Sequence, residues 1–245
     1  MGRLDGTTAI VTGASSGIGA ATARALAGDG ARVVGGARRV ERLETEIALE
    51  LDVTDPESCA RFVDEAGPAD ILVNAAGLAL GREPFSESTE EDERTVFETN
   101  VNGLVRMTRL VLQRSLREPG HIVNIGSVAG RWAYPNGATY VTSKFAVRGF
   151  TRALREDLLG RDIRVTTVDA GLVETEFSVV RFRGDVDKAK SVYEGTRPLT
   201  GEDVADAVLY AVTRPVHVVV DELVLMSIDQ SSGARINRRA SRGSA

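Results

Sequence analysis

The sequence contains little that supports metal or disulfide chemistry. Among its 245 residues Cys59 is the one cysteine, and His121 and His217 are the two histidines. One cysteine cannot form an internal disulfide, and two distant histidines do not complete the ligand set of a zinc site. Disulfide frameworks and thiolate clusters are therefore excluded, and we expect metal-free chemistry.

Long apolar runs and an excess of one charge are missing as well. No stretch approaches the roughly eighteen apolar residues of a membrane helix, and residues 1–6 lack the apolar core of an export signal. Lys and Arg number 30 against 35 Asp and Glu, a net charge of −5, whereas nucleic-acid binding usually requires a basic face. We therefore expect a cytoplasmic protein without a membrane or nucleic-acid partner.

One basic cluster interrupts this mildly acidic chain. It lies near the C-terminal end and consists of Arg235, Arg238, Arg239 and Arg242. We expect residues 235–245 to form a frayed tail.

Short apolar, β-branched runs alternate with helix-like segments along the chain. This alternation predicts βαβ units, and hence a doubly wound parallel α/β sheet with helices on both faces. We expect a single domain over residues 1–245 with about seven strands. The expected strands cover residues 7–12, 31–36, 47–53, 70–74, 121–127, 164–169 and 222–226. The expected helices cover residues 17–29, 56–66, 90–117, 139–159 and 201–213.

Two segments carry additional signals. Ser88 and Glu91 form a Ser-x-x-Glu capping box before the helix expected over 90–117, and the acidic residues that follow suit a helix N-terminus. Residues 174–199 have mixed charge and weak periodicity. We expect this segment to be a mobile substrate lid.

The first expected strand runs into a glycine-rich turn, Thr12-Gly-Ala-Ser-Ser-Gly-Ile-Gly19, which opens a helix. Glycine is needed where a backbone turns sharply, admits a pyrophosphate without a Cβ in the way, and offers it the free N–H groups of a helix. Gly13, Gly17 and Gly19 suit these tasks. The pattern alone also fits a tight strand-to-helix corner.

The second expected strand ends in two basic residues, Arg38 and Arg39. An acidic residue at this spacing holds the ribose hydroxyls of NAD, whereas guanidinium groups suit the 2′-phosphate of NADP. The sequence therefore favours NADP. A solvated helix start is the alternative reading.

A rival hydrolase reading uses the same turn. Gly13-Ala-Ser-Ser-Gly17 matches Gly-x-Ser-x-Gly, with Ser15 as the nucleophile and Asp169 and His217 following in the order of that fold. The reading is disfavoured because the turn follows the first strand, no His-Gly-Gly segment precedes it, and Gly19 is left unexplained.

Tyr140 and Lys144 lie four residues apart in an expected helix, so both project from one face. An ammonium ~4 Å from the phenol in an effective dielectric of ~20 contributes ~4 kcal/mol, about three pKa units. We therefore expect the pKa of Tyr140 to be lowered toward neutrality. Ser127 ends the fifth expected strand, at the edge where such sheets bind ligands, and can polarise a carbonyl there. The alternative for the Tyr140–Lys144 pair is a solvated helix face, and the alternative for Ser127 is a turn after the strand.

Together these segments resemble the short-chain dehydrogenase/reductase family over nearly the whole chain. Further matching segments are Asp52 in Leu-Asp-Val, Asn74-Ala-Ala-Gly77, Asn100 in Thr-Asn-Val-Asn-Gly, and Tyr140-Val-Thr-Ser-Lys144. Segments 76–81, 171–173 and 175–185 are similar to NADP-dependent 3-hydroxy acid dehydrogenases acting on serine and allo-threonine. The resemblance implies a Rossmann-like fold, hydride transfer between NADP and a secondary alcohol or carbonyl, and a homotetramer.

The resemblance also implies roles for the matching residues. Tyr140 is the expected general acid/base, Lys144 lowers its pKa and holds the nicotinamide ribose, and Ser127 positions the substrate oxygen. Asn100 is expected to anchor a water leading protons to Lys144. Asp52 and Val53 are expected to contact adenine, and Asn74 to line the ribose. The whole implied cofactor set is Gly13, Ser15, Ser16, Gly17, Ile18, Gly19, Arg38, Arg39, Asp52, Val53, Asn74, Ala75, Gly77, Tyr140, Lys144, Gly171, Val173 and Thr175.

Two residues depart from the family pattern. Ala75 replaces an asparagine, so local packing must be satisfied without one amide. Ala170 replaces a proline, which predicts a less constrained backbone beside the lid.

The substrate is the least determined part of this reading. Arg181 and Arg183 are candidates for binding a carboxylate, and Trp132 and Tyr134 for a pocket wall. Solvated charges and core packing are the alternatives. An NADPH-dependent aldehyde or ketone reductase of secondary metabolism and a non-catalytic NADP-sensing module also stay open.

The helix expected over 139–159 carries surplus apolar residues, Phe145, Phe150, Leu154 and Leu158. Such a surplus favours association between subunits, and simple burial against the sheet is the alternative.

Overall fold

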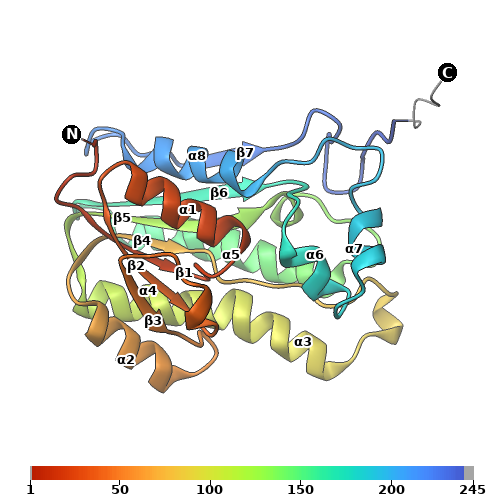
Figure 1. Ribbon diagram of the computed structural model, residues 1–245, viewed down its shortest axis with the longest axis horizontal. Coiled ribbons are helices and arrows are strands. Elements are labelled where there is room, and N and C mark those ends of the chain that lie inside the picture. Colours follow the sequence, from red (N-terminus) through yellow and green to blue (C-terminus); the bar gives the residue numbers. More distant parts are fainter. Residues whose placement is uncertain (1, 240–245) are drawn as a thin grey trace.

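A parallel sheet forms the centre of the molecule, as the computed structural model of residues 2–239 shows (Figure 1). Within these residues seven strands pair in the order β3-β2-β1-β4-β5-β6-β7. Their bounds are β1 Thr8–Thr12, β2 Arg32–Ala37, β3 Ile47–Glu50, β4 Ala69–Asn74, β5 Leu116–Ser127, β6 Ile163–Ala170 and β7 Glu222–Leu225. Each neighbouring pair is parallel. The expected doubly wound sheet is confirmed.

Helices cover both faces of the sheet. Their bounds are α1 Gly17–Gly28, α2 Pro56–Ala66, α3 Glu90–Phe97, α4 Leu104–Arg114, α5 Ala138–Asp157, α6 Glu176–Arg181, α7 Val186–Ser191 and α8 Gly201–Val212. One buried apolar cluster joins the sheet to α1 and α8, for example through Leu26 and Val208. A second joins it to α2, α4 and α5, through Phe62, Met107 and Leu154. The molecule therefore has three layers, with α1 and α8 on the opposite side from α2 and α4 (Figure 1).

The helix expected over 90–117 is built differently from the prediction. The α-helical pattern is interrupted by a π-helical turn over Glu98–Gly103, and α4 ends at Arg114, so that β5 begins at Leu116. A π-helical turn accommodates an extra residue and is often found at functional sites. The turn contains Asn100, one of the predicted catalytic residues.

The cap of this helix also differs. The expected Ser88–Glu91 capping box is wrong, because the hydroxyl of Thr89 accepts the N–H of Asp92 at 3.2 Å and Ser88 donates to Glu93 at 2.6 Å. A capping box is present instead at the start of α8, between Thr200 and Asp203.

The strand expected over 47–53 ends at Glu50. The side chain of Asp52 accepts the backbone N–H of Thr54 at 2.9 Å and its hydroxyl at 2.7 Å. Such a local side-chain turn competes with strand pairing and ends the ladder.

Part of the expected frayed tail is held in place. The N–H of Arg239 donates to the carbonyl oxygen of Gly195 at 2.7 Å, and its guanidinium pairs with the buried Asp229 at 3.0 Å. Residues 235–239 are therefore anchored, contrary to the prediction. Arg242 lies outside the described residues.

The surplus apolar residues of α5 mostly face the core. Leu154 and Leu158 are buried, and Phe150 packs against the same cluster. Phe145 is the exception and is 45% exposed. Burial against the sheet explains three of the four residues.

The described part of the chain contains neither a membrane-spanning helix nor a cluster of metal-binding side chains. Between residues 2 and 239, no helix is long and apolar enough to cross a membrane. The same residues contain no group of three or more His, Cys, Asp or Glu side chains able to hold a metal ion.

Candidate active site

A cleft of about 640 Å³ opens at the carboxyl ends of the strands, where the strand order reverses between β1 and β4. Open α/β sheets bind their ligands at this kind of switch point. The predicted residues that line the cleft are Gly13, Ser15, Ser16, Gly17, Ile18, Gly19, Arg38, Arg39, Asp52, Val53, Ala75, Gly77, Ser127, Tyr140, Lys144, Gly171, Val173 and Thr175. The sequence therefore identified most of this surface.

The glycine-rich turn forms the floor of the cleft. Gly13 has φ of +68°, and a Cβ on it would lie 2.8 Å from the backbone N and Cα of Ala76. Gly17 begins α1 with φ of +53°. A side chain at Gly13 would therefore be strained and would collide with the neighbouring loop. The first residues of α1, Gly17, Ile18 and Gly19, line the cleft, and a helix N-terminus suits a phosphate group.

A threonine holds the neighbouring loop in place beneath this turn. The hydroxyl of Thr12, at the end of β1, accepts the N–H groups of Ala75 and Ala76 at 3.1 Å each. This backbone contact supports the loop at Ala75, where the family pattern has an asparagine.

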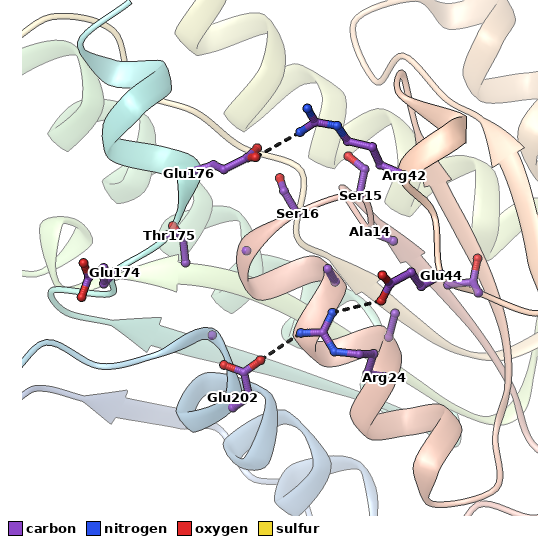
Figure 2. A pocket seen from close by; sticks show the side chains of 15 residues that line it. Ala14, Ser15, Ser16, Arg24, Arg42, Glu44, Glu174, Thr175, Glu176 and Glu202 are labelled. Atoms are coloured by element: carbon purple, nitrogen blue, oxygen red, sulfur yellow. Dashed lines mark hydrogen bonds and ion pairs between the residues drawn. The ribbon is translucent and has the colours of Figure 1, made fainter. Parts of the chain in front are cut away.

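Arginines gather at one end of the cleft. Arg39 donates to the hydroxyl of Ser16 at 3.3 Å and to the carboxylate of Glu176 at 3.1 Å. Arg42 reaches the other oxygen of Glu176 at 3.0 Å (Figure 2). Arg38 is exposed and also lines the cleft. This end therefore presents several cations to a ligand.

Ser127, Tyr140 and Lys144 meet at the other end of the cleft. Ser127 ends β5, whereas Tyr140 and Lys144 lie in the first turns of α5. The ammonium of Lys144 donates to the carbonyl oxygen of Ile125 at 3.0 Å and lies 5.8 Å from the centre of the Tyr140 ring. The expected grouping of the three side chains is present.

The pKa of Tyr140 shifts in the opposite direction from the prediction. Burial raises it above its ordinary value, and the Ser127 hydroxyl opposes this only in part. Burial also lowers the pKa of Lys144 to about 8, although Asp169 acts in the other direction. The expected lowering is wrong because the ammonium bonds to a backbone carbonyl while the phenol loses water, and loss of water disfavours the phenolate.

Asn100 supports the site from behind. It is buried in the π-helical turn, where its amide accepts the N–H of Leu78 and donates to the carbonyl oxygen of Leu78, both at 2.8 Å. It also donates to the hydroxyl of Ser143 at 3.1 Å. Its side chain does not line the cleft, and it ties the loop after Gly77 to α5.

Asn74 does not line the cleft either, contrary to the expectation that it lines the cofactor's ribose. Its amide nitrogen donates to Thr108 and to Asn124, both at 2.9 Å, inside the molecule. The side chains of β4 alternate between the two faces, and that of Asn74 points into the core between β4, β5 and α4.

The segment expected to be a lid packs directly on Tyr140. From α6, Phe177 meets the Tyr140 ring edge-on at 5.5 Å, and the guanidinium of Arg181 lies 5.8 Å from its centre. Arg181 also donates to the hydroxyl of Tyr134 at 3.3 Å and to the carbonyl oxygen of Gly81 at 2.9 Å. In this conformation α6 covers the reacting end of the cleft, and mobility of the segment stays a prediction.

Two of the expected substrate contacts lie elsewhere. Arg183 pairs with Asp92 at the start of α3, and Trp132 is 40% exposed and outside the cleft. Tyr134 does not line the cleft but contacts Arg181. None of these four predicted residues lines the cleft, but Arg181 lies beside Tyr140.

A buried ionic cluster lies behind the site, and the sequence did not reveal it. Asp169, at the end of β6, is 1% exposed and pairs with Arg131 at 2.6 Å. Arg131 also pairs with Glu222 of β7, which further accepts Arg148 at 3.3 Å and Arg152 at 3.0 Å. The paired residues lie 38 to 91 positions apart in the chain, so no local sequence pattern predicts these ion pairs.

The hydrolase alternative is contradicted by the same contacts. Asp169 is bonded to Arg131, and His217 is exposed in the loop that enters β7. That loop lies at the amino ends of the strands, whereas Ser15 lies at the carboxyl ends. The three residues therefore cannot form a triad.

Ala170 is more constrained than expected. It is buried, and it pairs with Ser127 of β5 and Leu225 of β7. Strand pairing on both sides supplies the restraint that the missing proline would otherwise give.

Sequence reasoning missed several residues of the cleft. Those with side chains that matter for the argument are Glu176, Phe177 and Val180 from α6, together with Arg42 beside the cleft. The three residues of α6 lie in the weakly periodic segment 174–199, from which the sequence predicted Thr175, Arg181 and Arg183 instead, whereas Arg42 gave no separate signal.

The fold and the cleft define an α/β protein with a dinucleotide-type site. A model of the family "short chain dehydrogenase" matches residues 7–184, and the chain belongs to this family. The chain is similar to an NADP-dependent 3-hydroxy acid dehydrogenase of Schizosaccharomyces pombe, with 40% identity over 98% of this chain and 99% of the relative.

Two further relatives agree with this placement. A serine 3-dehydrogenase of Agrobacterium fabrum is 37% identical over 95% of this chain and 99% of its own. The structure of the closed form of serine dehydrogenase complexed with NADP+ matches with a TM-score of 0.88 and 43% identity, over 91% of this chain and 96% of that one.

Proposed function

We propose that the protein is an NADP-dependent oxidoreductase that interconverts a short 3-hydroxy acid, such as serine or allo-threonine, and its carbonyl form. The observation that carries the proposal is the cleft itself. Its lining includes the glycine turn and the arginines together with Ser127, Tyr140 and Lys144. The names of the full-length relatives support the cofactor and the substrate class.

The residues of the cleft fit this cofactor. Its volume of about 640 Å³ lies within the range of about 300–1,000 Å³ usual for small-molecule sites. The turn at Gly13 and the start of α1 suit a pyrophosphate, and Arg38 and Arg39 suit a 2′-phosphate. The bound nicotinamide would supply or accept the hydride.

Residues of the chain itself can transfer the proton that accompanies the hydride. Burial keeps the Tyr140 phenol protonated at neutral pH, so it can donate a proton to the oxygen of a carbonyl substrate. The hydroxyl of Ser127 can hold the same oxygen, and Lys144, whose pKa of about 8 leaves it mostly protonated at neutral pH, can return a proton to the site. We assign Asn100 the task of holding the π-helical turn against α5, where a water path to Lys144 can form.

Arg181 is the residue best placed to select an acid. It lies against Tyr140 and has no carboxylate partner among residues 2–239. A substrate carboxylate is a stronger hydrogen-bond acceptor for a guanidinium than the carbonyl oxygen of Gly81. Arg183, already paired with Asp92, is not part of this proposal.

A neutral aldehyde or ketone is the second candidate substrate. Phe177, Val180 and Val173 make part of the cleft apolar, and such a surface accepts a neutral carbonyl compound as well.

The test is a spectrophotometric assay of NADP reduction with serine, allo-threonine, 3-hydroxypropionate and neutral alcohols. Tyr140→Phe removes the hydroxyl that exchanges a proton with the substrate oxygen, which accepts a proton in alcohol oxidation and donates one in carbonyl reduction, and should lower kcat about 10²- to 10⁴-fold. Tyr210→Phe on α8, far from the cleft, is the matched control and should keep full activity. Unchanged turnover in Tyr140→Phe would show that the phenol is not the acid.

The substrate class is tested separately with Arg181→Met. If the variant loses activity on hydroxy acids but keeps activity on neutral alcohols, the result supports a carboxylate-bearing substrate bound by Arg181. An equal loss on both classes contradicts the assigned role of Arg181.

We include a homotetramer and a cytoplasmic location in the proposal. The exposed Phe145 on α5 offers an apolar contact for a second subunit. The one cysteine, Cys59, is buried and unpaired, as is usual in a reducing compartment. Light scattering on the purified protein tests the assembly.

A further inference from the structure

Glu176 lines the cleft beside Arg39, one of the two arginines expected to bind the 2′-phosphate. Its two carboxylate oxygens accept Arg39 at 3.1 Å and Arg42 at 3.0 Å, so that one side chain bridges both guanidinium groups. Within residues 2–239 neither arginine has another carboxylate partner. A bridged pair of guanidiniums is the arrangement that a phosphate monoester also uses.

The bridge connects two parts of the chain that serve different ends of the cleft. Arg39 and Arg42 follow β2, beside the glycine turn, and Arg39 also donates to Ser16 of that turn. Glu176 is the first residue of α6, whose Thr175 caps the helix and whose Phe177 packs on Tyr140. A smaller hollow of about 300 Å³ shares Ser16, Thr175 and Glu176 with the cleft, and Figure 2 shows Glu176 reaching across it to Arg42 from the opposite side.

We propose that Glu176 is a specificity-determining residue that competes with the 2′-phosphate of NADP for Arg39 and Arg42. The proposal rests on the proposed function, because it takes NADP as the cofactor. When the phosphate takes the two guanidiniums, Glu176 loses its partners and the N-terminal turn of α6 is released from the edge of the cleft. NAD, which lacks this phosphate, leaves the bridge intact.

The balance of interactions supports such an exchange. Side chains of Arg39, Arg42 and Glu176 are between 42% and 48% exposed, so the ion pairs are screened by water and individually weak. A phosphate monoester carries up to two negative charges and three acceptor oxygens, and therefore binds the same guanidiniums more strongly. Carboxylate and phosphate repel each other, so both do not occupy the two arginines together.

The bridge is distinct from other ion pairs nearby. In the same hollow Arg24 pairs with Glu202 at 2.9 Å and with Glu44 at 3.6 Å (Figure 2). These pairs do not involve Arg39 or Arg42. Glu202→Gln therefore removes a nearby arginine-paired carboxylate, 68% exposed against 48% for Glu176, without touching the bridge, and is the control.

The first experiment measures nucleotide binding by calorimetry, without turnover. The ligands are adenosine 2′,5′-bisphosphate, which carries the 2′-phosphate, and adenosine 5′-phosphate, which does not. In Glu176→Gln the Kd of the bisphosphate should fall about tenfold at low salt, because one neighbouring negative charge is gone. The Kd of the monophosphate should change less than about twofold, and Glu202→Gln should change neither by more than that.

A second variant tests the cationic side of the bridge. Arg42→Gln should weaken the bisphosphate about tenfold and leave the monophosphate unchanged. Hydrogen exchange of the amides in α6 provides a readout of release. The bisphosphate should speed exchange over residues 176–181 in the unmodified protein, and the monophosphate should not.

The outcomes separate this inference from the proposed function. If the unmodified protein binds neither nucleotide, the NADP site and the inference both fail. If it binds the bisphosphate well but Glu176→Gln leaves that affinity unchanged or lower, only the competition is overturned. An equal gain for both nucleotides overturns it as well, because the 2′-phosphate is then not what Glu176 opposes.

Discussion

Two arginine–carboxylate clusters flank the cleft, and they differ mainly in burial. Behind the reacting end, Arg131 and Asp169 are 16% and 1% exposed. At the opposite end, Arg39 and Glu176 are 42% and 48% exposed. The same chemical groups therefore meet in two environments. We call the first the inner cluster (Arg131, Asp169, Glu222, Arg148, Arg152) and the second the outer bridge (Arg39, Arg42, Glu176).

Burial decides what each group of charges can do. Within the inner cluster Arg131, Asp169 and Glu222 stay largely out of water when a partner is lost, so the pairs among these three are effectively permanent. In the outer bridge water replaces a lost partner at little cost, so the pairs can exchange with a ligand. The inner cluster fixes the ends of β6 and β7 behind the site, and the outer bridge is free to respond to what enters the cleft.

The largest expected effect comes from breaking the inner cluster. Arg131→Met leaves the carboxylate of Asp169 buried without its guanidinium, and should lower the free energy of unfolding by about 3–5 kcal/mol. Denaturant unfolding measures this change. Arg152→Met, which removes a 53% exposed partner of Glu222, is the control and should cost less than about 1 kcal/mol. Equal losses of unfolding free energy in the two variants would show that the burial of the arginine does not decide its contribution to stability.

A second effect concerns acid stability. Burial opposes ionisation of Glu222, but Arg131, Arg148 and Arg152 outweigh it and lower its pKa from 4.5 to about 2. Because the folded pKa is depressed, this stabilisation is present above pH 4.5 and is lost as the pH falls toward 2, at a total of about 3 kcal/mol. Unfolding measured from pH 5 to 2 should therefore be less pH-dependent in Glu222→Gln.

The pKa of the neighbouring Asp169 shifts in the opposite direction, and it therefore affects the same pH profile. Burial raises its pKa more than Arg131 lowers it. Asp169 therefore gains a proton earlier on acidification and offsets part of the loss. A wild-type profile as flat as that of Glu222→Gln would contradict the assigned role of Glu222.

The smallest expected effect belongs to the outer bridge. Glu176→Gln should change the free energy of unfolding by less than about 1 kcal/mol, and the difference should shrink in 0.5 M salt as the Debye length shortens. Thermal or denaturant unfolding at two salt concentrations measures it. A loss as large as that of Arg131→Met would mean that the bridge is a structural element and not an exchangeable contact.

The fold was largely predictable because its signals are local. Each strand of the sheet is a short apolar run, and α2 was expected with the bounds that it has, Pro56–Ala66. The interruption at Glu98–Gly103 was not predictable, since nothing in its composition separates a π-helical turn from an α-helix. The end of β3 depended on a contact between Asp52 and Thr54 that strand periodicity does not register.

The site was predictable where backbone geometry or chain spacing decides the outcome. Gly13 and Gly17 have positive φ, and Tyr140 and Lys144 share a helix face. The direction of the Tyr140 pKa shift was not predictable, because it depends on how much water the lid segment removes from the phenol. Asn74 and Arg183 were misplaced because their partners, Asn124 and Asp92, lie far away in the sequence.

The six residues of α6 contact both the arginine end and the reacting end of the cleft. Glu176 at its first position is held by the arginines after β2, while Phe177 and Arg181 rest on Tyr140. Because one short helix carries both contacts, the proposed release of Glu176 would carry Phe177 and Arg181 with it. The proposal therefore predicts that cofactor binding changes access to Tyr140, which would appear in steady-state kinetics as an ordered addition of cofactor before substrate.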